Sequence, residues 1–462
     1  MGLVRVLANY VVETDFAHLP SEVVEQAKKA LLDCTGNMIG GRYTNKGEAI
    51  IKYILEKNNL AEATVIGSGK TSREMAAFAN GVMSRVLDLD DGHRFAFGHP
   101  GGVIIPTGLA IGEFTGASGS DVIAAFVIGY DVYARLGSVI NPSSYHERGF
   151  DATGVCGAVA AAAVAAKLYK LDVEKTKDAL GIAALQAGGI IEYQTDGTMG
   201  KVLCPAWSAS TGIRAAELAK LGFTGPETVL EGSKGFFQAF AKKYDPSRLT
   251  AELGSKYGIL QNYFKIHACM RGLHCAIDAL LSICAEHALS VHEVKEITIK
   301  TSTFVNRLNR PHPQTLVGAQ CSLPFTIAAA LKYGCVSEAV LTKSINDQEI
   351  SEIEEKINVV VDQKIQDYAV TNPDNWTAVE LEVITTDGKK LSQWSPIALG
   401  EPERPLAWEA LQEKFCHLVT ATEFEPLIEV ITTSIKQFDG YQTIGDFNAS
   451  LNPLDKQRGE LC

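Results

Sequence analysis

The spacing of apolar residues changes twice along this chain of 462 residues, and that limits the folds open to it. Up to about residue 285, apolar residues recur at helical spacing, as at Val23, Ala27 and Leu31. This spacing predicts a large helical domain. After residue 290, VKEITIKTS and TAVELEVITTDGKKLSQWS alternate apolar and polar residues, which predicts strands with a hairpin turn at Asp387-Gly388. The helical period returns from Pro405. We therefore expect a mainly α protein with a smaller α+β unit and final helices that rejoin the first domain.

Charge composition restricts the class of partner. The chain has 42 Lys and Arg against 54 Asp and Glu, a formal net charge of −12. A net field of this sign does not attract nucleic acid or an anionic membrane, so we expect neither as a partner. A small anionic substrate remains compatible, because a few buried cations can dominate one cleft.

Cysteine usage and the N-terminal residues indicate a compartment. The ten cysteines are scattered without a CxxC pair, which predicts reduced thiols. The first apolar run is interrupted by Arg5, Asn9 and Glu13, so no signal peptide is expected. The most apolar stretch, residues 155–168, is too short to span a bilayer. We therefore expect a cytoplasmic protein.

Gly67-Ser68-Gly69-Lys70-Thr71 resembles the end of a phosphate-binding loop, because it follows a strand-like segment and precedes a helix. The full motif requires a glycine where this chain has Thr64. A Gly-rich turn capped by Thr71 is the simpler interpretation. An NTPase is kept as a distant alternative.

Three carboxylates follow the helical segment that ends near residue 87: Asp88, Asp90 and Asp91. Like charges raise one another's pKa, and in a cleft this favours a role in proton transfer. His99 lies in a tight Gly-His-Pro loop nearby. A solvated helix end is the alternative, whereas a calcium loop is disfavoured because the later glutamate is missing.

A second cluster contains Lys265, His267, Arg271 and His274 just before a predicted helix. Lysine and arginine pair well with carboxylates, so this segment is a candidate substrate-binding loop. A polar interdomain linker is the alternative. The histidine spacing does not suit a metal site, and we expect none. Lys201 stands alone before an apolar stretch, where it either extends to solvent or faces a ligand.

Several segments, in this order, resemble the MmgE/PrpD family, which includes 2-methylcitrate dehydratase, cis-aconitate decarboxylase and iminodisuccinate epimerase. These segments are AAFANGVMSRVLDLDD, GHPGG, GFDATGVCGAVAAAAVAAKL, GKVLCPAWSASTG, KIHACMRGLHCAID and SLPFTIAAALKYG. The resemblance implies an all-helical domain from residues 1–268 and 402–462 and an α+β lid domain from residues 269–401. It also implies a homodimer and an interdomain cleft that works without a metal or an organic cofactor.

Carried over residue by residue, the resemblance places Asp88, His99, Lys201 and Lys265 in the active site. Two positions depart from the family pattern. Asp151 stands where the family usually has a histidine in a G-[WF]-H-P segment, and Phe325 stands where a tyrosine follows S-L-P. A threonine expected near residue 92 has no clear counterpart. These departures remove an imidazole and a phenol that could carry protons.

The resulting prediction is a lyase that abstracts a proton next to a carboxylate of a small di- or tricarboxylic acid. Lys201, Lys265 and Arg271 would hold substrate carboxylates, and His267 and His274 are further candidate ligands. Asp88 and His99 would exchange protons, with Asp151 as a second acid or base. A dehydratase acting on a citrate-like acid is the first choice, and a cis-aconitate decarboxylase-like reaction is included. Epimerisation of an iminodicarboxylate is the runner-up, followed by an inactive binding protein.

Overall fold

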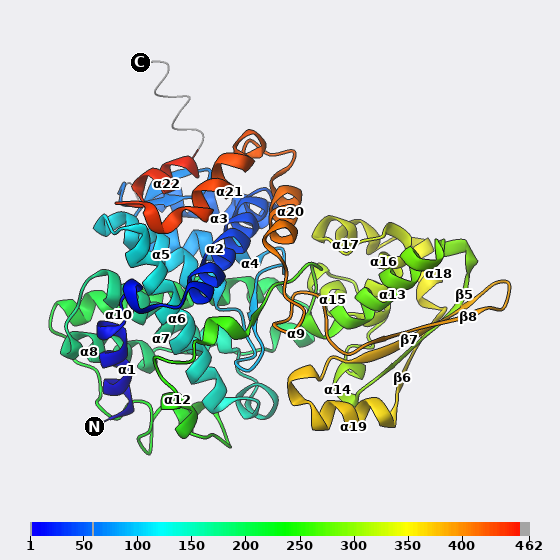
Figure 1. The fold of residues 1–462 in the computed structure, drawn as a ribbon, viewed down its shortest axis with the longest axis horizontal. Coiled ribbons are helices and arrows are strands. Elements are labelled where there is room, and N and C mark those ends of the chain that lie inside the picture. Colours follow the sequence, from blue (N-terminus) through cyan, green and yellow to red (C-terminus); the bar gives the residue numbers. More distant parts are fainter. Residues whose placement is uncertain (1, 58–59, 453–462) are drawn as a thin grey trace.

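The computed structural model describes residues 2–57 and 60–452, and it is mainly helical with one small mixed sheet (Figure 1). Its buried apolar side chains form two separate groups. One is built from residues 4–268 together with 406–451, and the other from residues 269–398. We refer to these two parts as the helical domain and the α+β domain.

The helical domain is arranged around α7 (Ala152–Leu168), which α5, α6, α8 and α10 surround. All but one of the residues of α7 are buried, and most are alanine or glycine, so neighbouring helices can approach closely. A Cβ atom at Gly212 of α10 would lie only 2.4 Å from the Cβ of Ala161. The longer helices are α1 (Leu3–Glu13), α2 (Ser21–Arg42), α3 (Asn45–Lys57), α4 (Arg73–Arg85), α5 (Gly101–Thr115), α6 (Gly119–Ile140), α8 (Val173–Leu185) and α10 (Cys204–Lys220), and the short ones are α9 (Tyr193–Asp196), α11 (Phe236–Phe240) and α12 (Ser247–Thr250).

The last three helices belong to the same domain as the first. They are α20 (Trp408–Val419), α21 (Ile428–Lys436) and α22 (Gly445–Ser450). Helices α20 and α21 pack on α2, and α22 packs on α5, as Figure 1 shows where the red and orange helices lie beside the blue and cyan ones. The α+β domain is therefore inserted between two segments of the chain that together form the helical domain.

The α+β domain contains a four-stranded sheet in the order β6-β5-β7-β8. Strands β5 (Val294–Thr301) and β6 (Ile357–Val361) are parallel, whereas β5 pairs antiparallel with β7 (Val379–Thr385) and β7 with β8 (Lys390–Ser395). Alternate residues of β7 are buried, and α13 (His274–His287) packs against β7 and β8. The predicted hairpin turn is confirmed, with Gly388 at a φ of 86°. The remaining helices are α14 (Thr303–Asn306), α15 (Leu316–Gln320), α16 (Leu323–Tyr333), α17 (Glu338–Ser344), α18 (Gln348–Glu354) and α19 (Gln363–Thr371).

One helix of the described residues, α6, is by itself long and apolar enough to cross a bilayer. Within its most apolar window, 94% of the residues are buried inside the helical domain. This burial is typical of a core helix. The apolar stretch singled out in the sequence, residues 155–168, forms most of the shorter helix α7.

The phosphate-loop segment forms a β-hairpin. Strands β1 (Ala63–Val65) and β2 (Gly69–Thr71) pair antiparallel, with Thr64 opposite Lys70. Lys70 forms an ion pair with Glu113 at 2.8 Å. The expected cap is also wrong by one residue, because the Ser72 hydroxyl, rather than Thr71, accepts the Met75 amide at the start of α4. The NTPase alternative depended on a phosphate-binding loop at residues 67–71, and the structure has a β-hairpin there instead.

Candidate active site

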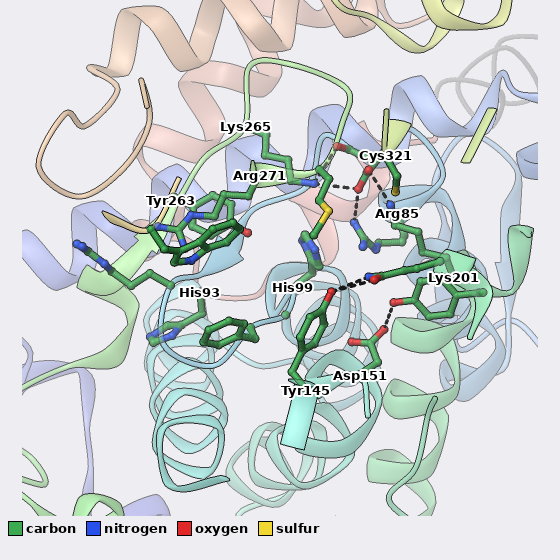
Figure 2. A pocket seen from close by; sticks show the side chains of 18 of the residues that line it. Arg85, His93, His99, Tyr145, Asp151, Lys201, Tyr263, Lys265, Arg271 and Cys321 are labelled. Carbon is green, nitrogen blue, oxygen red and sulfur yellow. Dashed lines mark hydrogen bonds and ion pairs between the residues drawn. The ribbon is translucent and has the colours of Figure 1, made fainter. Parts of the chain in front are cut away.

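A cavity lies where the two domains meet, and Figure 2 shows it from close by. The helical domain supplies most of its lining: Arg85, Asp88, His93, Arg94, Phe97, Gly98, His99, Tyr145, Asp151, Tyr193, Gln194, Lys201, Tyr263 and Lys265. The α+β domain supplies Met270, Arg271, Phe304, Cys321 and Trp376. We call this space the interdomain cavity.

Two short strands bring distant parts of the chain together beside the cavity. Strands β3 (Gly92–His93) and β4 (Asn262–Tyr263) pair antiparallel, with Gly92 opposite Tyr263. A Cβ atom at residue 92 would lie 2.2 Å from the Tyr263 hydroxyl, so only glycine fits there. The pairing places the acidic segment that precedes β3 next to Lys265, which follows β4.

Asp88 is the centre of a buried cluster of charges. Its Oδ2 atom accepts a hydrogen bond from Lys201 Nζ at 2.6 Å, and its Oδ1 atom accepts from Lys265 Nζ at 2.9 Å and from Arg85 Nη1 at 2.8 Å. All four residues are buried, with at most 5% of their surface exposed. Asp88 has a φ of 55°, a left-handed conformation that aspartate tolerates better than most residues. We call these four residues the Asp88 cluster.

The electrostatics of this cluster are set by burial and by the three cations. Burial alone would raise the pKa of Asp88, but the charges of Lys201, Lys265 and Arg85 outweigh it and hold that pKa well below its usual range. Burial lowers the pKa of Lys265, although Asp88 opposes the shift. Asp88 is therefore a carboxylate, and Lys265 releases its proton more readily than an exposed lysine does.

His99 reaches the same cavity with one nitrogen engaged. Its Nδ1 atom lies 2.7 Å from the backbone oxygen of Asp91, so Nδ1 carries the proton and Nε2 keeps a lone pair. Burial, followed by the charges of Arg85 and Lys265, holds the pKa of His99 well below 6.5. His99 is thus a neutral imidazole that can accept a proton at Nε2.

The other two carboxylates of the acidic segment hold the loop in place. Asp91 accepts hydrogen bonds from the Tyr130 hydroxyl at 2.7 Å and from the Gly101 amide at 2.9 Å. Burial, followed by the neighbouring charge of Asp33, raises its pKa to about 7. Asp90 accepts from Arg85 at 2.6 Å, and burial raises its pKa. The three acids therefore differ, since only Asp88 is surrounded by cations.

Asp151 lines the cavity and also begins a helix. Its Oδ1 atom accepts the Thr153 amide at 2.8 Å as the N-cap of α7, and its Oδ2 atom accepts the Tyr193 hydroxyl at 2.7 Å. Both oxygens are therefore occupied by donors. Asp151 therefore lines the cavity, but its hydrogen bonds do not identify it as a second acid or base.

Arg271 also lines the cavity, but its charge is already paired. It forms two hydrogen bonds with Glu401, Nε to Oε1 at 2.5 Å and Nη2 to Oε2 at 2.9 Å. Its guanidinium lies 4.9 Å from the centre of the Tyr263 ring. The sequence predicts that Arg271 binds a substrate carboxylate. In the structure, the carboxylate of Glu401 already occupies its guanidinium group.

Three predicted positions lie outside the cavity lining. His267 bonds to Asp278 at 3.0 Å, and the two imidazoles of His267 and His274 stack edge-on. His274 is turned toward the backbone oxygen of Cys269. Phe325 is buried in the apolar core of the α+β domain. The two histidines are near Lys265 in sequence, but neither lines the cavity, so we do not retain them as substrate ligands.

Arg85 and the aromatic residues of the cavity are absent from the sequence-based prediction. Arg85 precedes Asp88 by three residues, a helical spacing for ion pairs that could have revealed it. Tyr145, Tyr193 and Trp376 belong to no motif, and only the fold brings them to the cavity.

Within the parts of the chain that the structure describes, no three His, Cys, Asp or Glu side chains are grouped so that they could hold a metal ion. The cavity offers instead a neutral imidazole, an ionised carboxylate and two ammonium groups. Together they can remove a proton from carbon and stabilise the negative charge that develops.

The comparison with family models agrees with this architecture. Residues 5–249 match the MmgE/PrpD N-terminal domain, and residues 267–429 match the MmgE/PrpD C-terminal domain. The chain belongs to the MmgE/PrpD family, which includes lyases. The resemblance read from the sequence segments is thereby confirmed.

Curated relatives of the chain carry related names. A cis-aconitate decarboxylase-like protein, oryM, from Aspergillus oryzae is 30% identical over 71% of this chain and 73% of its own length. The cis-aconitate decarboxylase of Homo sapiens is 28% identical over 86% of this chain and 84% of its own. That of Mus musculus is 26% identical over 91% and 88%, respectively.

Proposed function

We propose that the protein is a lyase that acts on a small carboxylic acid with more than one carboxylate, and that its own residues provide the acid and the base. The observation that carries this proposal is the position of neutral His99 beside Asp88, Lys201 and Lys265 in one buried cavity. Lys201 and Lys265 contribute to this cluster although they lie 113 and 177 positions away from Asp88 in sequence.

The charges of the site support binding of an anion. Arg85, Lys201 and Lys265 provide three positive charges against the two carboxylates they contact, Asp88 and Asp90, so the balance within this contact group is 3 − 2 = +1, and Asp151 is a further carboxylate of the cavity lining. A substrate carboxylate that enters the cavity would share Lys201 and Lys265 with Asp88. The attraction between the substrate carboxylate and the two lysines is strong because the site is shielded from water.

The protonation state of His99 supports a reaction that begins with loss of a proton. In a dehydration, His99 Nε2 would take the proton from the carbon next to a carboxylate, and that electron pair would form the C=C bond. The C–O bond breaks, and the departing hydroxide takes a proton from the Lys265 ammonium and leaves as water. The lowered pKa of Lys265 favours this transfer.

Decarboxylation is the second candidate, because the relatives named above are cis-aconitate decarboxylases. Here a C–C bond breaks and CO₂ leaves. The electron pair moves through the double bond to a carbon that then takes a proton. A neutral His99 has no proton on Nε2, and its Nδ1 proton is held by the Asp91 oxygen, so Lys265 would be the donor.

One experiment separates these reactions from each other and from epimerisation. The protein is incubated in D₂O with citrate-like, unsaturated and iminodicarboxylic acids, and products are followed by NMR and by CO₂ release. We expect formation of a double bond or release of CO₂, and Lys201→Ala should lower kcat/KM by about 10²-fold or more, the typical effect of losing one stabilising donor. Deuterium uptake without net conversion would indicate an epimerase. Binding without any turnover or exchange would contradict the proposed function.

A homodimer is part of the same proposal, since the family resemblance implies one. Leu185 of α8 and Trp207 of α10 are apolar side chains that are more than half exposed, and burial of such side chains at an interface would be favourable. Sedimentation velocity should show a dimer at micromolar concentration, and a monomer would contradict this assignment.

A further inference from the structure

We infer that the substrate is an acid whose carboxylates lie at one end and whose other end is an alkyl or aryl group. This inference rests on the proposed function and narrows its substrate class. It depends on the separation of charge and aromatic surface within the interdomain cavity. In Figure 2, Arg85 and Lys201 lie on one side of His99, whereas Tyr263 and His93 lie on the other.

Aromatic rings from both domains line part of the cavity. Phe97 and Tyr145 come from the helical domain, with ring centres 5.7 Å apart. Phe304 and Trp376 come from the α+β domain, with ring centres 4.2 Å apart. His146 joins the two pairs, because its ring lies 5.5 Å from Phe97 and 4.7 Å from Phe304. We call these five residues the aromatic wall, of which all but His146 line the cavity.

The two arginines that line this side of the cavity are each paired with a glutamate. Arg271 is paired with Glu401, and Arg94 donates to Glu403 at 2.6 Å. Arg94 Nε and Trp376 Nε1 are buried donors without a hydrogen-bond partner among the described residues. They can serve a neutral acceptor, but they do not change the charge balance set by Glu401 and Glu403. A third substrate carboxylate would therefore find no uncompensated cation among the residues that line this side, whereas Arg307, whose guanidinium is 5.7 Å from the Phe304 ring, is not part of the lining.

Asp151 adds a further obstacle to such a carboxylate. It lines the cavity as a carboxylate whose oxygens accept from Thr153 and Tyr193. A substrate carboxylate placed against it would meet charge of the same sign in a site with little water. The aromatic wall, by contrast, gains from contact with an apolar group, since burial of apolar surface is favourable. The geometry therefore favours a dicarboxylate with an apolar substituent over a citrate-like tricarboxylate.

Ligands that share a succinate core test this directly. Succinate, 2-benzylsuccinate and tricarballylate (2-carboxymethylsuccinate) differ only in one substituent. Binding to the full-length protein is measured by isothermal titration calorimetry. We expect 2-benzylsuccinate to bind about ten-fold or more tightly than succinate, the size expected for burial of a ring, and tricarballylate to bind no more tightly than succinate.

Two variants assign the preference to the residues named. Phe304→Ala should weaken 2-benzylsuccinate at least about five-fold and change succinate by less than about two-fold, because only the benzyl group contacts the ring. Asp151→Asn keeps an N-cap residue and removes the charge, so tricarballylate should bind more tightly while 2-benzylsuccinate is unchanged. Phe223→Ala, at an exposed aromatic residue of the helical domain, is the control.

The outcomes distinguish this inference from the proposed function. Tighter binding of tricarballylate than of 2-benzylsuccinate to the wild-type protein would overturn the inference and leave the proposed function standing. The same holds if Phe304→Ala weakens all three ligands equally while thermal unfolding shows an intact fold. Failure of all three acids to bind would contradict the proposed function itself, because Lys201 and Lys265 would then not hold carboxylates.

Discussion

His99 keeps a lone pair on Nε2 because the backbone oxygen of Asp91 fixes the proton on Nδ1. We expect His99→Gln to lower kcat/KM by about 10²- to 10⁴-fold, the usual contribution of a positioned base. Because the pKa of His99 lies well below 6.5, acidification from pH 8 to pH 6 should not protonate it in the free enzyme. His267→Gln is the matched control, since that imidazole lies outside the cavity. Equal losses in both variants would contradict the assignment to His99.

Asp91 makes the stability of the fold depend on pH. Its pKa is about 7 in the folded protein and about 3.9 in an unfolded chain, so the folded state holds an extra proton between these values. The resulting stabilisation is complete below pH 4 and is lost as the pH rises through 7. We expect the Tm of the wild-type protein to fall relative to that of Asp91→Asn between pH 5 and pH 8. Asp387→Asn, whose carboxyl has a pKa of about 2, should leave this trend unchanged.

At the scale of elements, α20 holds the acidic segment from behind. Lys414 of α20 donates to Asp33 of α2 at 2.6 Å and to the backbone oxygen of Leu89 at 2.7 Å. Lys414→Met leaves the Asp33 carboxylate buried without its partner and should reduce the free energy of unfolding by about 3–5 kcal/mol. Adding Asp33→Asn should recover much of that loss. Urea unfolding of the four proteins of this cycle measures the coupling, and purely additive effects would contradict it.

The elements that the sequence predicts well are those whose signal is local. The hairpin of β7 and β8 follows from alternation and an Asp-Gly turn, both contained in about twenty residues. Residue patterns alone predict the cluster around Asp88 only as separate pieces, because Lys201 is 113 positions away and no periodicity links the two, and it is the family resemblance that brings them into one site. His267 and His274 show the opposite error. They adjoin Lys265 in sequence, yet neither lines the cavity, since His267 bonds to Asp278 and His274 faces the backbone oxygen of Cys269.

At the scale of the whole molecule, the chain crosses between the domains twice, and the two crossings are joined. The Phe264 amide donates to the Gly400 oxygen at 3.0 Å, and the Leu399 amide donates to Asp278 at 2.7 Å. Between them, the pair of Arg271 and Glu401 is buried beside the cavity. The two apolar cores are separate, so the domains are joined by contacts such as these crossings, the cavity walls and the bond from the Thr315 hydroxyl to the Gly197 oxygen.

Glu401→Gln tests whether this junction couples the unfolding of the two domains. The substitution leaves the Arg271 charge buried without its carboxylate, which should cost about 3–5 kcal/mol at the junction while both apolar cores stay intact. We expect calorimetry to show one transition for the wild-type protein and two for the variant. A dicarboxylate that contacts both domains in the cavity should bring the two transitions closer together, because it stabilises only the state in which both are folded. A variant that unfolds in one transition, merely shifted to lower temperature, would show that the domains are coupled through other contacts.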